Sequence, residues 1–257
     1  MSWLDDYIAT LQARPMPPMD ALEAAARDAA PPRDFLATLQ TKAAPAVIAE
    51  VKFKSPSQGV IRPAYDVEHV AASYEVAGAA CLSVLVDEPF FGGSLAFLGR
   101  ARAACGLPLL AKGFFVDRRD VLQVRDAGAD ALLLIAKCLD RQTLSDLHEL
   151  SRELGMATLV ELHSEADLAK VAGLDLPLVG VNHRDLDTLA MDLDLSRRLL
   201  PSLPQAALKV AESGLETADD LARMATLGFG AVLVGTGFMR HPEPGKALCD
   251  FLEGVHA

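Results

Sequence analysis

The fold class is decided by residues 130–162, DALLLIAKCLDRQTLSDLHELSRELGMATLVEL. This stretch opens and closes on short apolar runs, DALLLIAK (130–137) and ATLVEL (157–162), which are rich in Leu and Val. Such runs are typical of parallel strands that are buried on both faces. Between them, residues 143–154 have a helical pattern that stops at Gly155. The stretch therefore predicts a strand, a helix and a second strand that runs parallel to the first.

The same unit recurs along the chain. Further apolar runs are VIAEVK (47–52), ACLSVLV (80–86), PLLAK (108–112), PLVGVN (177–182), ALKVAES (207–213) and AVLVG (231–235). Helical patterns at 66–77, 117–127, 164–171 and 217–227 stop at Gly78, Gly128, Gly173 and Gly228. Eight such units predict an α/β fold, a closed (β/α)₈ TIM barrel. The competing open doubly wound sheet usually has a glycine-rich fingerprint after its first strand, and the sequence has none there.

Residues 1–46 lie outside this repeat. They contain two helix-like stretches, 2–13 and 19–29, which are broken by prolines at 15–18 and by Pro31-Pro32. We expect a helical N-terminal extension that packs on the barrel of residues 47–257 and is not a separate domain.

Composition narrows the class of function. The 257 residues carry a net charge of −11, which argues against nucleic acid as the main partner because phosphate backbones select basic surfaces. A small anionic substrate stays open, since a cleft can be locally positive. The four cysteines form no CxxC pair, which predicts free buried thiols in a reducing compartment. The sequence has no signal-length apolar run and no stretch of ~20 uncharged apolar residues, so we expect a cytoplasmic protein without a membrane partner.

Polar residues gather where the predicted strands end. A barrel enzyme has its active site at that rim, and a charged residue in an apolar strand is costly unless it is paired. One such residue could be a structural ion pair, but a converging set favours chemistry: a lysine among apolar walls can have a lowered pKa and act as a general acid, with a glutamate beside it as base. Cationic lysines can also hold a substrate carboxylate. The strand-end residues are Glu50, Lys52, Lys112, Lys137, Glu161, Asn182, Glu212 and Ser213.

Loops after the first, seventh and eighth strands suggest ligand contacts. Ser213-Gly214 and Gly235-Thr236-Gly237 offer backbone N–H groups where this fold usually binds phosphate, although each glycine could also form only a tight turn. The segment KSPSQG (54–59) is either a surface turn or a mobile loop that covers substrate.

Several stretches resemble a known family. IAEVKFKSPSQGVI (48–61) is similar to the signature of indole-3-glycerol phosphate synthases, with its E-x-K-x-x-S-P-S-x-G core. The resemblance continues in order through LSVLVDEPFFGGSLAFL (82–98), LPLLAKGFFVD (107–117), LGMATLVELHSEADL (154–168), VGVNHRDL (179–186) and VAESGL (210–215). It covers the chain from about residue 35 to the C-terminus, and the helical extension is also typical of the family.

The resemblance implies a reaction. The substrate would be the small phosphorylated molecule 1-(2-carboxyphenylamino)-1-deoxyribulose 5-phosphate. The enzyme would close the ring onto the sugar ketone and then lose carbon dioxide and water to give indole-3-glycerol phosphate for tryptophan synthesis. No metal and no organic cofactor are implied. We expect a monomer, with a homodimer as the alternative.

The resemblance also implies catalytic roles. Lys112 would be the general acid that protonates the ketone oxygen, and Lys52 would grip the anthranilate carboxylate and assist loss of the hydroxyl. Glu161 would be the general base or stabilise the developing cation on nitrogen, and Glu50 would orient the lysines and could share the base role. The implied catalytic set is Glu50, Lys52, Lys112, Glu161, Asn182 and Ser213.

Substrate contacts are implied at the rim. Asn182 would hydrogen-bond a sugar hydroxyl, and Glu212 and Ser213 would line the rim near the seventh strand. Phe91 and apolar strand residues would flank the aromatic ring. The phosphate would be contacted by Ser55, Arg184, Gly214, Gly235 and Thr236.

The sequence departs from the family pattern at three positions. Gly113 replaces the aspartate of the usual Lys-Asp-Phe, His183 stands where Asn or Ser is usual, and Thr236-Gly237 replaces a Glu-Ser or Ser-Ser pair. Two alternatives stay open. Another phosphosugar barrel enzyme, such as phosphoribosylanthranilate isomerase, would share the phosphate loops without needing E-x-K on the first strand. A non-catalytic barrel would bind an anionic ligand or a partner enzyme without turnover.

Overall fold

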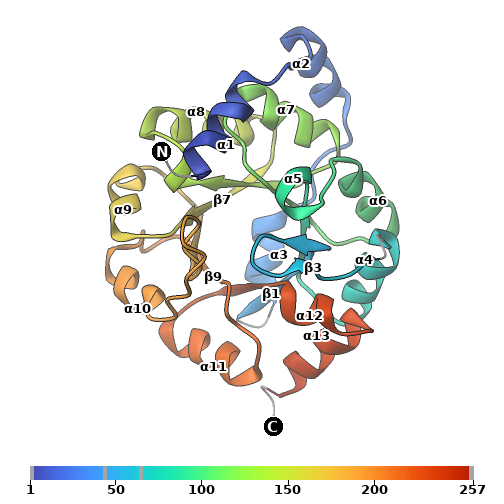
Figure 1. Cartoon of the computed structure of the whole chain (residues 1–257), viewed down its shortest axis with the longest axis vertical. Coiled ribbons are helices and arrows are strands. Elements are labelled where there is room, and N and C mark those ends of the chain that lie inside the picture. The colour runs from blue at the N-terminus through green and yellow to red at the C-terminus, as the bar shows by residue number, and fades with distance from the viewer. Residues whose placement is uncertain (1–2, 43–44, 64–65, 255–257) are drawn as a thin grey trace.

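Eight parallel strands form a closed ring at the centre of the computed structural model, which describes residues 3–42, 45–63 and 66–254 (Figure 1). β1 pairs with β10 on one side and with β4 on the other, so the first and last strands close the barrel. The predicted (β/α)₈ barrel is therefore confirmed. In ring order the strands are β1 (Ala46–Val51), β10 (Ala231–Val234), β9 (Leu208–Glu212), β8 (Leu178–Asn182), β7 (Ala157–Leu162), β6 (Ala131–Ile135), β5 (Leu109–Lys112) and β4 (Cys81–Leu85).

The five helices expected between these strands are present, with ends shifted by one or two residues. Each is followed by the glycine that the sequence marked as its stop, and all five glycines have positive φ, from 74° at Gly173 to 96° at Gly78. Only glycine adopts this left-handed backbone without strain, which is why the helices end there. The helices are α4 (Val67–Val76), α7 (Arg118–Asp126), α8 (Arg141–Glu153), α9 (Glu165–Val171) and α11 (Ala218–Leu227).

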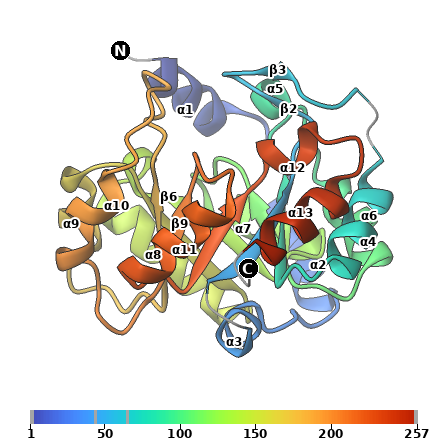
Figure 2. The ribbon, with the colours of Figure 1, turned by 90° about the horizontal axis from the view of Figure 1, so that it is seen from below.

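The segment after β1 forms a short hairpin and not a simple surface turn. Lys54–Ser55 (β2) and Gly59–Val60 (β3) pair as an antiparallel hairpin beside the open end of the barrel. Figure 2 shows this hairpin and α12 at the same end of the molecule. The remaining elements are α5 (Glu88–Phe91), α6 (Ala96–Ala104), the 3₁₀ turns η1 (Ala136–Cys138) and η2 (Leu200–Ser202), α10 (Leu195–Leu199), α12 (Thr236–Arg240) and α13 (Pro244–Glu253).

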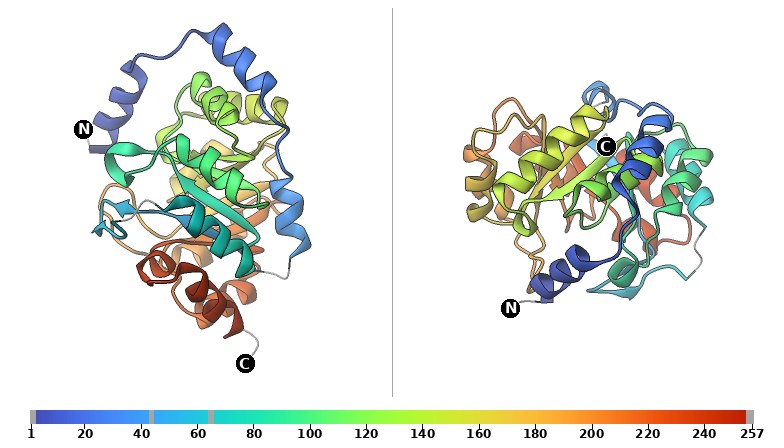
Figure 3. Two further views of the ribbon diagram at one scale, coloured as in Figure 1. Left: turned by 90° about the vertical axis from the view of Figure 1, so that its right-hand side faces the viewer. Right: turned by 90° about the horizontal axis from the view of Figure 1, so that it is seen from above.

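The N-terminal segment wraps along the outside of the barrel from one end to the other (Figure 3). The two expected helices are α1 (Trp3–Ala13) and α2 (Met19–Asp28), and residue 2 of the first prediction lies outside the described residues. α2 packs on α7 through Leu22, Ala26 and Leu122. A third helix, α3 (Phe35–Thr41), was not predicted; it begins at Asp34, whose side chain accepts a hydrogen bond from Ala37 N, and it lies across the closed end of the barrel (Figure 2).

The four cysteines are free thiols, as expected. Cys81 and Cys105 are buried, whereas Cys138 and Cys249 are only partly buried, so the prediction that all four are buried was wrong for those two. Within the described residues, no helix combines the length and the apolar character needed to cross a bilayer.

Candidate active site

A cavity of about 240 Å³ opens at the carboxyl ends of the barrel strands. Every residue of the implied catalytic and substrate-binding sets lines this cavity except Glu212, and Lys137, which was also predicted at a strand end, does not line it. The structure thus brings together the residues implied for catalysis, for the aromatic ring and for the phosphate. The named residues on its wall are Glu50, Lys52, Ser55, Phe91, Lys112, Glu161, Asn182, Arg184, Ser213, Gly214, Gly235 and Thr236.

Glu50 and Lys52 enter the cavity from the end of β1. Strand side chains alternate, so residues two apart share a face, and here that face is the inside of the barrel. Lys52 Nζ lies 2.5 Å from Glu50 Oε2. The other carboxylate oxygen, Glu50 Oε1, lies 3.9 Å from Lys112 Nζ. Glu50 therefore sits between two ammonium groups and fixes their separation.

Lys112, at the end of β5, is the centre of a buried charge cluster. Its Nζ lies 2.5 Å from Glu212 Oε2 and 3.3 Å from Glu161 Oε2. The two glutamate side chains are almost completely buried, whereas the Lys112 side chain keeps 15% of its surface exposed. Buried carboxyl groups need a nearby cation, and Lys112 is the ammonium that both of these glutamates contact.

The pKa of Lys112 is shifted in the direction opposite to the one the sequence suggested. Burial lowers the pKa of Lys112, but the carboxylates of Glu212, Glu161 and Glu50 together outweigh burial and raise it above its ordinary value. The prediction of a lowered pKa was wrong because it took account of the apolar walls around Lys112 but not of the three carboxyl groups beside it. These carboxyl groups therefore favour the protonated, ammonium form of Lys112.

The pKa values of the two glutamates beside Lys112 are shifted in opposite directions. Burial raises the pKa of Glu161, but Lys112 and His163 outweigh burial and hold it well below its ordinary value. Burial and the charge of Glu161 raise the pKa of Glu212 well above its ordinary value, and Lys112 offsets only part of that rise. Of the two coupled carboxyl groups, Glu161 is thus the more acidic and Glu212 the one that binds a proton more tightly.

Glu212 does not line the cavity as expected; it lies beneath Lys112. Its Oε1 fills the space where a side chain at residue 180 would be, because a Cβ on Gly180 would collide with that oxygen. Gly180 of β8 therefore makes room for a carboxyl group inside the barrel. Glu212 contacts Lys112 from below, so it acts on the lysine and has no open path to a ligand.

His163 is a residue that the sequence analysis missed. It follows β7, its side chain is fully buried, and its Nε2 lies 3.1 Å from Glu161 Oε1. Lys112 approaches the other oxygen of the same carboxylate, so Glu161 is held from both sides. His163 follows Glu161 by two residues and shares its face of the strand, which is the signal that could have identified it.

Ser213 and Gly214 form a tight turn after β9. Both have left-handed backbones, with φ of 68° at Ser213 and 71° at Gly214. His183 holds this turn: its Nδ1 is 2.8 Å from the Ser213 carbonyl oxygen and its Nε2 is 2.7 Å from Ser196 Oγ. Because a carbonyl oxygen only accepts, Nδ1 carries the proton and Nε2 accepts from the serine hydroxyl. Burial lowers the pKa of His183, in keeping with a neutral ring.

Gly235 has a packing role in addition to the phosphate contact that the resemblance implies. A Cβ at this position would collide with the Glu50 carboxylate, so the glycine at the end of β10 makes room for Glu50. Gly235, Thr236 and Gly237 nevertheless line the cavity beside the Ser213-Gly214 turn. The hairpin after β1 completes this wall: Ser55 Oγ is buried and has no hydrogen-bond partner among the described residues, and Gln58 bonds to Arg240 of α12.

The opposite wall is apolar. Phe91 and the strand residues Leu85, Leu133 and Ile135 line it, together with Phe114 from the loop after β5. Trp3 of α1 also lines the cavity, although the extension was not expected to contribute to the site. No periodic pattern in residues 1–46 could have identified Trp3. The described residues include no group of three or more His, Cys, Asp or Glu side chains arranged to hold a metal ion.

A family model described as indole-3-glycerol phosphate synthase matches residues 5–251. The chain belongs to the indole-3-glycerol phosphate synthase family. The match begins at residue 5, within α1, so it extends over the N-terminal helices as well as the barrel.

Curated relatives agree with this membership. The indole-3-glycerol phosphate synthase of Albidiferax ferrireducens is 46% identical over 236 residues, which cover 91% of this chain and 89% of that protein. The protein of the same name from Azoarcus sp. is 46% identical over 249 residues, covering 95% and 93%.

Solved structures are similar in fold at low sequence identity. The alpha subunit of tryptophan synthase from Legionella pneumophila superposes with a TM-score of 0.63 at 14% identity, covering 86% of this chain and 97% of that one. A 3-hexulose-6-phosphate synthase from Salmonella typhimurium gives 0.61 at 12% identity, covering 82% and 98%. These likenesses show the barrel alone.

The departures from the indole-3-glycerol phosphate synthase pattern have structural settings. His183 is satisfied by the two hydrogen bonds described above. Gly113 sits in a tight space, because a Cβ there would lie 3.0 Å from Val86 Cγ2 and 3.3 Å from Phe115 Cζ. Thr236 keeps a hydroxyl on the cavity wall.

Proposed function

We propose that this chain converts 1-(2-carboxyphenylamino)-1-deoxyribulose 5-phosphate to indole-3-glycerol phosphate, with loss of carbon dioxide and water. The observation that carries the proposal is the meeting of Lys112, Glu161, Glu50 and Lys52 around one cavity. This cavity has an apolar wall for an aromatic ring and, across from it, glycine-rich turns and a buried hydroxyl for a phosphate.

Lys112 is the proposed general acid. Its ammonium already holds the proton that the ketone oxygen needs during ring closure. Because its pKa is raised, Lys112 is a weak acid, so we infer that the proton moves late, after the oxygen has gained negative charge. Glu212 and Glu50 keep the ammonium in place while the substrate binds.

Glu161 is the proposed base. It is ionised and held on both oxygens, so it is oriented to take a proton from the ring or to stabilise positive charge on the nitrogen. Lys52 is the proposed contact for the anthranilate carboxylate, with Glu50 setting its position. Asn182 Oδ1 accepts a hydrogen bond from Arg184 N, which leaves the amide nitrogen for a sugar hydroxyl.

The phosphate seat is proposed to consist of Ser55, Arg184, Ser213-Gly214 and Gly235-Thr236. Replacing Thr236 with valine keeps the shape and removes the hydroxyl. We expect KM to rise about tenfold, the effect of losing one hydrogen bond to a charged group, while kcat changes little. Steady-state kinetics measures both constants, and a loss confined to kcat would contradict a phosphate contact at Thr236.

A turnover assay tests the function. The purified protein, given the carboxyphenylamino-deoxyribulose phosphate without added metal, should produce indole fluorescence that grows with time. Binding without turnover would favour the non-catalytic barrel. Turnover of phosphoribosylanthranilate instead would favour the isomerase.

The remaining expectations are proposals of the same kind. Residues 1–46 are proposed to form an extension of one barrel domain, residues 47–257. The free thiols support a reducing, cytoplasmic location. A monomer, with a homodimer as the alternative, can be tested by light scattering.

A further inference from the structure

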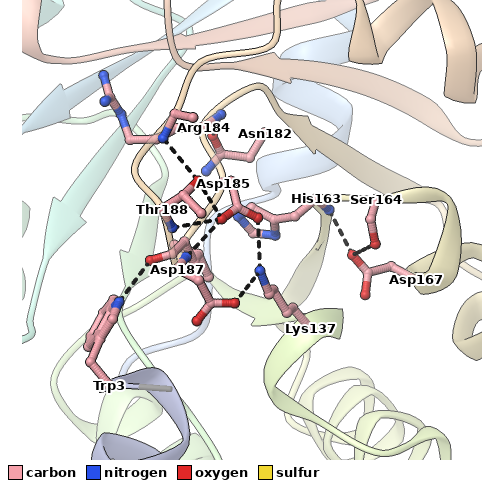
Figure 4. A network of polar contacts seen from close by, with 12 residues as sticks. Trp3, Lys137, His163, Ser164, Asp167, Asn182, Arg184, Asp185, Asp187 and Thr188 are labelled. Atoms are coloured by element: carbon pink, nitrogen blue, oxygen red, sulfur yellow. Dashed lines mark hydrogen bonds and ion pairs between the residues drawn. The ribbon is translucent and has the colours of Figure 1, made fainter. Parts of the chain in front are cut away.

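Lys137 is a strand-end charge that the proposed reaction does not use. It follows β6 in η1, and its side chain points away from the cavity toward the loop after β8 (Figure 4). Lys137 Nζ lies 2.9 Å from Asp185 Oδ2 and 2.8 Å from Asp187 Oδ2. One ammonium therefore joins two carboxylates of a neighbouring loop.

That loop, residues 184–191, is here named the substrate loop. It is a tight hairpin, closed by a bridge between Arg184 and Met191 and by the hydrogen bond from Asp185 N to the Ala190 carbonyl oxygen. Four of its residues face inward and line the cavity: Arg184, Leu186, Leu189 and Met191. The loop is thus a cavity wall on its inner side and an ion-pair network on its outer side.

Asp185 organises the loop from within. Its Oδ1 accepts hydrogen bonds from Asp187 N at 3.0 Å, Thr188 N at 2.8 Å and Thr188 Oγ1 at 2.9 Å. Its Oδ2 is left for Lys137. The carboxylate that sets the turn is therefore the same one that ties the turn to the barrel.

The conformation held in this way is a strained one. Leu189 has a φ of 59°, a left-handed backbone that a leucine adopts only when its surroundings impose it. Its carbonyl oxygen accepts a hydrogen bond from the Arg184 guanidinium at 3.0 Å. The position of Arg184 thus depends on the same turn that Asp185 and Lys137 hold.

The two aspartates need the lysine. Asp185 and Asp187 both direct an oxygen at Lys137 Nζ, so without that ammonium the two negative charges would repel each other. The network itself consists of Lys137 of η1 and the two aspartates of the loop. Asp5 of α1 lines the same surface pocket as Lys137 and Asp187, and the Lys170 ammonium lies 3.4 Å from the Lys137 carbonyl oxygen. Trp3 of α1 adds a neutral hydrogen bond to the Leu186 carbonyl oxygen.

We propose that Lys137 is a positioning residue, which holds the substrate loop against the barrel so that Arg184 and the apolar side chains of the loop form the cavity wall. The predicted effect on substrate binding rests on the proposed function, whereas the predicted effect on the loop conformation does not. Substrate kinetics tests the first effect, and Trp3 fluorescence tests the second.

Trp3 is the probe for the loop. It is the single tryptophan of the sequence, and its Nε1 donates a hydrogen bond to the Leu186 carbonyl oxygen at 3.1 Å. Replacing Lys137 with methionine keeps the length of the side chain and removes its charge. We expect Trp3 fluorescence to become more accessible to acrylamide, and Lys137→Arg to restore the protection of the wild type. Unchanged quenching in a folded Lys137→Met variant would overturn the proposal.

The dependence of Trp3 quenching on salt provides a second test, which is made on the wild-type protein. The three side chains of the network are partly exposed, so sodium chloride should weaken their pairing and increase Trp3 quenching in the wild-type protein. Potassium chloride should give the same response, because screening depends on ionic strength, and Lys209→Met, at the other end of the barrel, controls for the loss of a lysine elsewhere. Quenching that does not respond to salt in the wild type would also overturn the proposal.

Kinetics then tests the link to the substrate. For Lys137→Met we expect KM to rise about threefold to tenfold, the range that two partly exposed ion pairs allow, with kcat within about twofold. Adding Asp187→Asn should recover part of this loss, because it removes the repulsion between the aspartates. A kcat loss with unchanged KM would contradict a positioning role. Absence of turnover in the wild type would refute the proposed function and leave the fluorescence result standing.

Discussion

Replacing Lys112 with alanine is expected to lower kcat at least ~10²-fold, the usual size of a lost general acid. Lys112 is the ammonium that faces the cavity while it contacts Glu212 and Glu161. The alanine variant leaves these buried acids without their cation, so its melting temperature should fall as well. Indole fluorescence measures kcat, and thermal unfolding measures the loss of stability.

Lys112→Arg separates chemistry from folding. The guanidinium keeps the positive charge and the ion pairs, but it does not release a proton at accessible pH, so kcat should stay low while stability recovers. Lys209→Ala is a matched control, because Lys209 also lies on a strand, β9, but does not line the cavity. Near-normal turnover in either Lys112 variant would remove this residue from the mechanism.

Replacing Glu161 with glutamine is expected to lower kcat by a similar factor, at least ~10²-fold, with a folded protein. The amide fills the same volume but has neither the negative charge nor the affinity for a proton. Lys112 keeps its contacts with Glu212 and Glu50, so the cluster stays compensated. The comparison is kcat of Glu161→Gln against Glu216→Gln, since Glu216 lines the same cavity without an assigned role.

The pH dependence of the wild type gives a second check on Glu161. Its pKa is held below the ordinary carboxyl value, so it stays ionised as the pH falls. Protonation of Glu161 should therefore not reduce kcat/KM between about pH 7 and pH 5. The substrate phosphate titrates at about pH 6 in every variant, so the informative quantity is the difference between variants. An acid limb that moves upward into this range in His163→Leu would show that the histidine helps to keep Glu161 ionised. A wild-type acid limb in this range that disappears in Glu161→Gln would contradict the assignment.

The fold could be predicted from the sequence because its signals are local. Apolar runs marked the eight strands, and glycines such as Gly78 and Gly228 marked helix ends because their backbones are left-handed. α3 was missed because it is only seven residues long. β2 and β3 were missed because each strand has only two residues. Such short elements depend on tertiary contacts more than on periodicity.

The sequence predicts which residues gather at the site, but not how their side chains are arranged there. Strand alternation places Glu50, Lys52, Lys112 and Glu161 at one rim, and the structure brings them together there. The sequence does not show how deeply a strand-end side chain is buried or in which direction it points. Glu212 lies beneath Lys112. Lys137, also at a strand end, points outward and pairs with two aspartates. The direction of a pKa shift depends on such neighbours, which is why the expectation for Lys112 was wrong.

The contact between Gly235 and Glu50 couples assembly of the molecule to its chemistry. The Glu50 carboxylate packs against Gly235, directly after β10, which is the last barrel strand to be synthesised, although Glu50 itself lies on the first strand. A chain that stopped before residue 231 would contain Glu50, Lys52, Lys112 and Glu161, but it would lack the backbone against which the Glu50 carboxylate packs. Activity regained during refolding should therefore appear only when the two ends of the ring have met.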